Sequence, residues 1–153
     1  IPVFNGLGKT GVVGRIDGEL GPGKMIGLRA DMDALPLQEK NTFPHASTHA
    51  GKMHACGHDG HTAMLLGAAQ YLSNHREFRG SVVFIFQPAE EGGAGAQEMI
   101  NDAPAESIKL LRINSRLVRL DIVFYIFSGA VIPRIDSPVF KIICVALQRF
   151  FLA

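Results

Sequence analysis

Cysteine is scarce in this chain of 153 residues, and net charge is nearly absent. The two cysteines, Cys56 and Cys144, are too few for a disulfide framework, which favours a reducing, cytoplasmic location. The formal net charge is only +1, so we expect no nucleic-acid partner and no anionic membrane partner. The apolar runs at 122–127 and 139–147 are too short to span a bilayer.

The start of the chain lacks an initiator methionine and the basic and apolar segments of a signal peptide. We therefore expect a fragment or a processed chain. Apolar residues make up 47% of the sequence, which is enough for the core of one domain.

Histidine and glycine are almost missing from the last third of the sequence. All six histidines and 16 of the 17 glycines lie in residues 1–102. That segment carries 8 Lys/Arg against 11 Asp/Glu (net −3), and residues 103–153 carry 7 against 3 (net +4), which sum to +1. So abrupt a shift marks a domain boundary or a change in the origin of the sequence, and we place it near Asp102.

Hydrophobic patterning before that boundary predicts alternating strands and helices. Residues 10–17 alternate as a strand does, residues 24–30 read as a hairpin return strand or a neighbouring strand, and residues 81–87 form an apolar run typical of a buried central strand. Helices are predicted at 62–76 and 93–101, and residues 1–9 and 31–48 are expected to be loops. The sequence therefore predicts an α/β fold in which a partial mixed sheet is flanked by helices.

A cluster of polar side chains at residues 54–61 precedes the first predicted helix. It holds three imidazoles, one thiol and one carboxylate. Cys56 and His58 are separated by one glycine, so both can reach one ion from a loop, and this pair of ligands suits Zn²⁺ or a similar divalent ion. Two alternatives stay open: a helix start capped by Asp59 or Thr62, and a Cys-His nucleophilic pair.

Pairs of carboxylates follow two of the predicted strands. Glu90 and Glu91 can divide the work of a hydrolytic site, one binding a metal and the other taking a proton from water, or they can simply favour a helix N-terminus. Asp31 and Asp33 could bind the ion, orient a ligating histidine or form a plain turn. Glu90 and Glu91 follow a strand, and the cluster at residues 54–61 precedes a helix. We therefore expect the glutamate pair and the cluster on one rim of the sheet.

Three motifs together carry a family resemblance. Residues 28–36 (LRADMDALP), 53–63 (MHACGHDGHTA) and 80–93 (GSVVFIFQPAEEGG) closely resemble the metal-dependent amidohydrolases of the aminoacylase/carboxypeptidase superfamily. The nearest branch comprises hippurate hydrolases, N-acyl-L-amino-acid amidohydrolases and plant indole-3-acetyl-amino-acid hydrolases. The resemblance implies a catalytic α/β domain with two divalent metals (Mn, Zn or similar) and a smaller lid domain, and we expect the lid domain to be absent from this chain. It also implies homo-oligomers.

The resemblance assigns roles to five residues. Cys56, His58 and Glu91 are implied to be metal ligands, and Glu90 the general base. Related branches have His-x-Asp at positions 31–33, so Asp33 is expected to keep its role of orienting a ligand, whereas a carboxylate at position 31 cannot act as an imidazole ligand. The implied reaction is attack of metal-activated water on the amide carbonyl of an N-acyl amino acid, with Glu90 passing the proton to the leaving amine.

The resemblance ends near residue 102. The family's two further ligands are histidines, and the chain has no histidine after His75. We therefore expect residues 1–102 to be a fragment of a catalytic domain, and residues 103–153 to be an unrelated tail that is frameshifted or disordered. Hydrolysis of hippurate-like N-acyl amino acids is expected by ancestry, but impaired or absent in this chain. The alternative is a non-catalytic remnant or interaction module.

Overall fold

The computed structural model describes residues 1–103, and it contains four strands and two helices. In chain order these are β1 (Val3–Leu7), β2 (Gly11–Asp17), β3 (Met25–Asp31), α1 (His58–Asn74), β4 (Ser81–Gln87) and α2 (Gly95–Asp102). The predicted tail from residue 104 onward, including the apolar runs at 122–127 and 139–147, lies outside the described residues. Within the described part, no helix is long and apolar enough to cross a membrane.

The four strands form one mixed sheet in the order β1-β2-β4-β3. β2 runs antiparallel to both of its neighbours, whereas β3 and β4 are parallel. The expectation that β3 would pair or lie beside β2 was therefore wrong, because β4 lies between them. All seven residues of β4 are buried, and a strand that is apolar on both faces needs neighbours and covering layers on every side.

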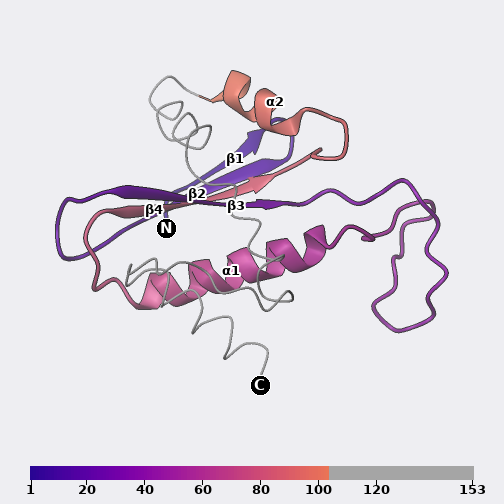
Figure 1. Ribbon diagram of the computed structural model, residues 1–153, viewed down its shortest axis with the longest axis horizontal. Helices are drawn as coiled ribbons and strands as arrows, with labels where there is room; N and C mark the ends of the chain where they lie inside the picture. The colour runs from indigo at the N-terminus through magenta and orange to yellow at the C-terminus, as the bar shows by residue number, and fades with distance from the viewer. Residues whose placement is uncertain (104–153) are drawn as a thin grey trace, which may run out of the picture.

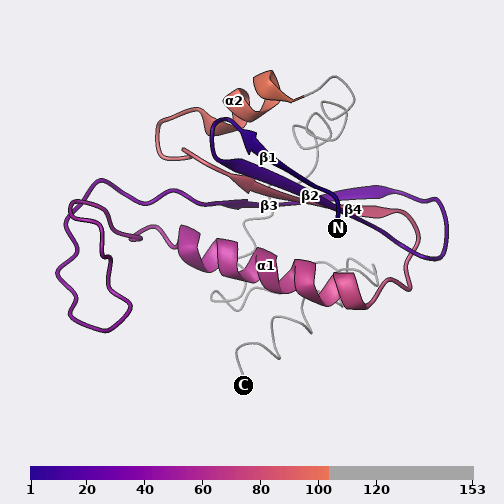
Figure 2. The ribbon, with the colours of Figure 1, turned by 180° about the vertical axis from the view of Figure 1, so that it is seen from behind.

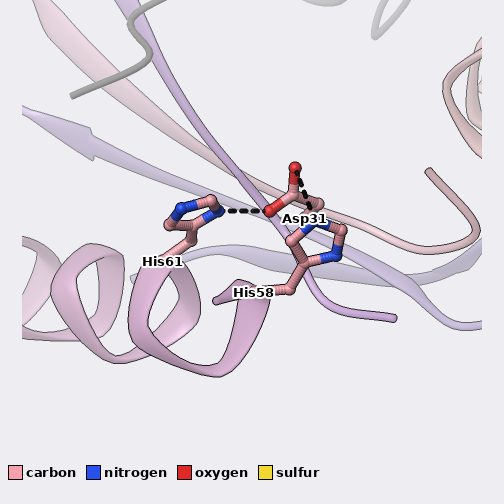
Figure 3. A group of neighbouring side chains, drawn as sticks. All are labelled: Asp31, His58 and His61. Atoms are coloured by element: carbon pink, nitrogen blue, oxygen red, sulfur yellow. Dashed lines mark hydrogen bonds and ion pairs between the residues drawn. The ribbon is translucent and has the colours of Figure 1, made fainter. Parts of the chain in front are cut away.

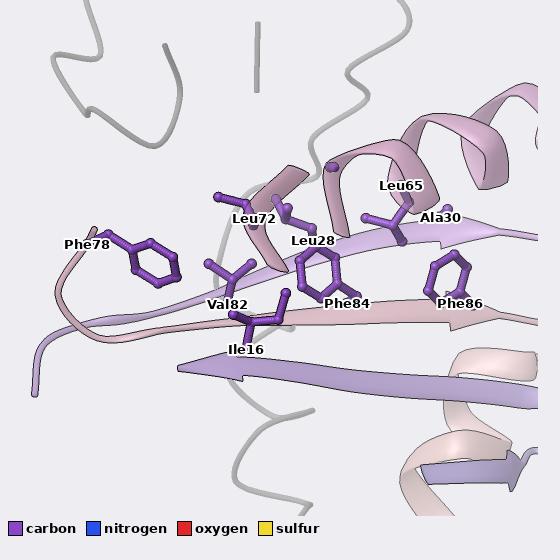
Figure 4. Close-up of a cluster of buried hydrophobic side chains, with 10 residues drawn as sticks. Ile16, Leu28, Ala30, Leu65, Leu72, Phe78, Val82, Phe84 and Phe86 are labelled. Carbon is purple, nitrogen blue, oxygen red and sulfur yellow. The ribbon is translucent and has the colours of Figure 1, made fainter. Parts of the chain in front are cut away.

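Each face of the sheet is covered by one helix, as Figures 1 and 2 show from opposite sides. Alternate residues of β4 point to opposite faces. Phe84 packs on the α1 side with Leu65 and Leu72 (Figure 4), whereas Ile85 packs on the α2 side with Met99. The predicted mixed sheet flanked by helices is therefore confirmed.

The largest differences from the predicted elements are a strand within the expected loop at residues 1–9 and an earlier start of the first helix. Residues 3–7 form β1. Most side chains of β1 are exposed, so its sequence VFNGL carries no alternation of apolar and polar residues that would indicate a strand. Helix α1 begins at His58, four residues before the predicted start, after Gly57 in the left-handed conformation (φ 90°) and without a side-chain cap. The alternative in which Asp59 or Thr62 caps the helix was therefore wrong, since the glycine conformation sets the helix start.

The arrangement of β3 and β4 creates the rim on which the polar motifs lie. Because the two strands are parallel and Asp31 pairs with Gln87, their carboxyl ends meet at one edge of the sheet. The long loop after β3 returns to this edge, where Leu35 and Met53 form an isolated antiparallel bridge. The loop then leads directly into α1. Two loops and a helix start therefore converge at the same place.

Candidate metal centre

Three of the predicted metal ligands converge at this rim. Cys56, His58 and Glu91 each offer one ligand atom, and these atoms lie within 4.8 Å of one another. Cys56 and Glu91 are exposed, whereas the side chain of His58 is only 3% exposed. The expectation that the Cys/His cluster and the glutamate pair share one rim of the sheet is thus confirmed. We call these three residues the outer set.

Asp33 touches two members of the outer set. The Nδ1 atom of His58 lies 3.0 Å from the backbone oxygen of Asp33 and 3.1 Å from its Oδ1 atom. Since both partners are acceptors, Nδ1 carries the proton, and Nε2 keeps its lone pair for an ion. The other carboxylate oxygen of Asp33 accepts a hydrogen bond of 2.9 Å from the backbone N–H of Glu91. One carboxylate thus positions a ligand from each of two segments.

Hydrogen bonds keep Asp33 ionised. Burial alone would raise the pKa of Asp33, but N–H groups of Glu91, Glu90 and Asp33 itself, together with His58, outweigh it, so the pKa falls below its usual value. A carboxylate that accepts several N–H groups favours its charged form. Asp33 therefore presents a stable negative charge to the imidazole behind the ligand atom.

The thiol of Cys56 is held in its neutral form. A hydrogen bond with the Glu91 carboxylate raises the pKa of Cys56, and burial and the charges of Glu91, Asp31 and Glu90 raise it further. A nucleophilic thiol needs the opposite, a pKa lowered by positive surroundings. The environment therefore disfavours the Cys-His nucleophile, whereas a cation would relieve the repulsion and produce the thiolate.

Glu90 lies beside the outer set without joining it. Its side chain is exposed and belongs to neither group of metal-binding geometry among residues 1–103. The loop that carries it departs from β4 through Ala89, which has a positive φ of 51°. An open cleft of about 550 Å³ adjoins this loop. Its wall includes Asp33 and Glu91, the apolar side chains of Met32 and Pro36, and Lys52.

The structure also brings together Asp31, for which the sequence left several roles open, and His61, to which no role was assigned from the sequence. Asp31 is buried at the end of β3, and its Oδ1 atom lies 2.6 Å from Nδ1 of His61 (Figure 3). Its Oδ2 atom accepts a hydrogen bond of 2.9 Å from Arg29. The hydroxyl of Thr62 donates to the Asp31 backbone oxygen. The sequence feature that could have revealed this pair is the three-residue spacing of His58 and His61. This spacing places both side chains on one face of α1 only if the helix already includes His58.

The donors present fit a divalent transition metal. A thiolate, an imidazole and a carboxylate are the ligand types of Zn²⁺ sites, and three protein ligands leave a position open for water or substrate. The orientation of His58 by Asp33 is the arrangement that usually fixes a ligating imidazole. The types and spacing of the outer-set side chains therefore fit one divalent ion.

Comparisons with known proteins agree with this chemistry. The model of peptidase family M20/M25/M40 matches residues 27–146. The chain is 54% identical over 101 residues to an N-acetyl-L-cysteine deacetylase of Bacillus subtilis, covering 65% of this chain and 24% of that protein. It is 46% identical over 138 residues to a hippurate hydrolase of Campylobacter jejuni, covering 88% of this chain and 36% of that protein.

A solved structure shares the fold. The YXEP protein of Bacillus subtilis, described as a dinuclear metal binding peptidase, superposes with a TM-score of 0.61 at 48% identity. The match covers 66% of this chain and 28% of that one. The chain thus spans about a quarter to a third of the length of these relatives. Two of the matches extend beyond residue 102, and the boundary expected there stays a prediction.

Proposed function

Because this chain belongs to peptidase family M20/M25/M40, we propose that it derives from a metal-dependent amidohydrolase that cleaves N-acyl amino acids. The observation that carries this proposal is the convergence of Cys56, His58 and Glu91 within 4.8 Å at the rim of the sheet. Relatives named as a hippurate hydrolase and an N-acyl-L-amino acid amidohydrolase support hippurate-like substrates. A small molecule of this kind also suits the adjacent open cleft.

Each residue at the rim has a distinct task in this proposal. Cys56, His58 and Glu91 hold the ion, and Asp33 keeps His58 in the tautomer whose Nε2 faces it. A divalent ion such as Mn²⁺ or Zn²⁺ supplies Lewis-acid chemistry, which polarises the amide carbonyl and acidifies water. The carboxylate of Glu90 takes the proton of the attacking water and delivers it to the leaving amine. Glu90 is exposed and lies between Ala89 and Glu91, which both line the cleft.

The reaction as a whole belongs to the longer relatives. One solved neighbour is described as dinuclear metal binding, and the resemblance implies two further histidine ligands, whereas residues 76–153 contain no histidine. We therefore propose that the chain binds one ion with reduced affinity and that its hydrolytic activity is impaired or absent. In a full-length form we expect a cytoplasmic homo-oligomer.

The test combines hydrolysis with metal binding. Hippurate and N-acetyl amino acids are incubated with the chain in the presence of added Mn²⁺ or Zn²⁺, and metal uptake is measured on the same preparation. Activity that depends on metal and disappears in Glu90→Gln, but not in the control Glu98→Gln on the exposed side of α2, would support the assigned roles. Metal uptake without hydrolysis would support the impaired form. Absence of both would refute the proposed function.

One observation favours a second candidate, a non-catalytic remnant. The absence of histidine from residues 76–153 deprives the chain of the ligand type that the family uses to complete its centre. Resequencing the codons for residues 101–105 and translating every forward frame discriminates between the two. A frame that restores a Gly-x-His motif about two dozen residues after Glu91 would reveal the full-length enzyme. Confirmation of the present frame would favour the remnant.

A further inference from the structure

A second group of metal-binding side chains lies behind the outer set. Asp31, His58 and His61 each offer one ligand atom, and these atoms also lie within 4.8 Å of one another. We propose that this inner set is an alternative divalent-metal site, so that the chain holds an ion in either of two positions that share His58. Two imidazoles and one carboxylate are a recurrent ligand set of catalytic zinc and non-haem iron sites. The inner set goes beyond the proposed function, which uses neither Asp31 nor His61.

The geometry of His58 explains why the two positions compete. Its Nε2 atom lies 3.7 Å from Oδ2 of Asp31 and 3.9 Å from Oε1 of Glu91, so one lone pair faces a carboxylate on either side. Two ligand atoms of a tetrahedral Zn²⁺ stand about 3.3 Å apart at ordinary bond lengths. Either pair needs a movement of only a few tenths of an ångström. A neutral imidazole nitrogen binds one ion at a time, so occupancy of one position excludes the other.

The inner set is the more rigid of the two. Asp31 and His58 are buried, with side-chain exposures of 7% and 3%, and His61 is held in the first turn of α1. Buried donors that are already oriented lose little conformational freedom on binding an ion. The ion must, however, displace the hydrogen bond from His61 Nδ1 to Asp31, and Arg29 remains paired with the same carboxylate. We therefore expect the inner set to bind more weakly than the outer set when a thiophilic metal is offered.

The two sets differ in chemical softness, which gives each its own ion. The outer set includes the Cys56 thiolate and should prefer Cd²⁺, Zn²⁺ and Co²⁺. The inner set offers only nitrogen and oxygen and should be the better site for Mn²⁺. Metal identity therefore decides which position is filled.

Cobalt binding tests the inner set directly, because only thiolate ligation gives an intense near-ultraviolet charge-transfer band. The full chain without a histidine tag is titrated with Co²⁺ in a Cys144→Ser background, so that Cys56 is the sole thiol. We expect one Co²⁺ per chain with the thiolate band. The double variant Cys56→Ser/Glu91→Gln should still bind one Co²⁺, without the band and at least tenfold more weakly. Adding His61→Ala to it should abolish binding, whereas adding the exposed His49→Ala should not.

Several outcomes would overturn the inner set. Loss of all Co²⁺ binding in the double variant, with its circular dichroism unchanged, would show that no second position exists. Two ions per wild-type chain would refute competition for His58. Binding without a thiolate band in the wild-type background would count against the outer set and the proposed function, while leaving the inner set intact. The two proposals can thus fail separately.

A measurement on the unaltered chain guards against misfolding of the variants. Alkylation of Cys56 is followed with saturating Cd²⁺ or with Mn²⁺, whose binding is monitored by electron paramagnetic resonance. We expect Cd²⁺ to protect the thiol and bound Mn²⁺ to leave it reactive. Equal protection by both ions, or no binding of Mn²⁺, would contradict the inner set.

Discussion

Asp33 offers the sharpest test of how the outer set is built, because a change of one atom alters its hydrogen bonding without altering its size. Its carboxylate accepts from His58 Nδ1–H at 3.1 Å and from the Glu91 backbone N–H at 2.9 Å. In Asp33→Asn only one oxygen remains, and the amide NH₂ must face one of the two donors. A hydrogen bond to a charged group, about 1.5–3 kcal/mol, is replaced by a donor-donor contact.

We expect Asp33→Asn to weaken Zn²⁺ binding about 10- to 100-fold, the usual cost of losing a group that orients a metal ligand. This range corresponds to roughly 1.4–2.7 kcal/mol. The loss should be smaller than that of His58→Ala, since the backbone oxygen of residue 33 also accepts from Nδ1 at 3.0 Å and preserves the tautomer. Affinity is measured by competition with a chromophoric chelator.

The control for this experiment is Asp17→Asn. Asp17 is an aspartate at the end of β2, but its side chain is 61% exposed and, within residues 1–103, pairs only with Arg15. An affinity change below twofold in Asp33→Asn, or an equal change in both variants, would refute the orienting role. That result would also mean that the loop after β4, and not the hydrogen bond to Asp33, fixes the position of Glu91.

Three further predictions concern stability. Leu72→Ala should cost about 2–5 kcal/mol of unfolding free energy in urea because Leu72 is fully buried, whereas Leu66→Ala, 56% exposed on the same helix, should stay within about 0.5 kcal/mol. Gly95→Ala should lower both stability and metal affinity, because the added Cβ would lie 1.7 Å from the Pro88 backbone oxygen. Alanine ordinarily favours a helix over glycine, so an unchanged thermal midpoint would contradict this steric argument. Zn²⁺ at 100 times its Kd should stabilise the chain by about 2.7 kcal/mol, and a chelator should remove this gain in the parent chain but change nothing in His58→Ala.

The central strand could be predicted from the sequence because its physical requirements are local. Residues 82–86 are continuously apolar, and Gly80 and Pro88 bound the strand that contains them; such a run is stable only when both faces are covered. The pairing of β3 could not be predicted, since the turn residues between β2 and β3 are equally compatible with a hairpin. The crossover through α1 returns β4 beside β3 instead, which separates two strands that are consecutive in sequence.

The start of α1 was misplaced for a reason that also hid a group of donors. Apolar spacing detects a helix from its first core residue, here Leu65, but the first turn is polar and carries no such period. The backbone conformation of Gly57, which begins the helix, leaves no mark in the hydrophobic pattern. Once the helix is known to include His58, the three-residue step to His61 puts both rings on one face, with centroids 5.5 Å apart. The inner set was therefore encoded in the sequence but depended on that boundary.

The two aspartates of the DMD motif show where sequence reasoning reaches its limit at this site. Both are aspartates two positions apart, but their surroundings differ. Asp31 ends β3 and forms an ion pair with Arg29, whereas Asp33 lies in the following loop and accepts hydrogen bonds from backbone N–H groups. A buried carboxylate with a guanidinium partner needs no ion for its burial to be tolerated, and one fixed by main-chain donors is oriented before any ion arrives. Both carboxylates are therefore held in place by the protein alone. It follows that metal should bind to a site already formed, with little change in circular dichroism, and that a large increase in helix or strand content on adding Zn²⁺ would contradict this view.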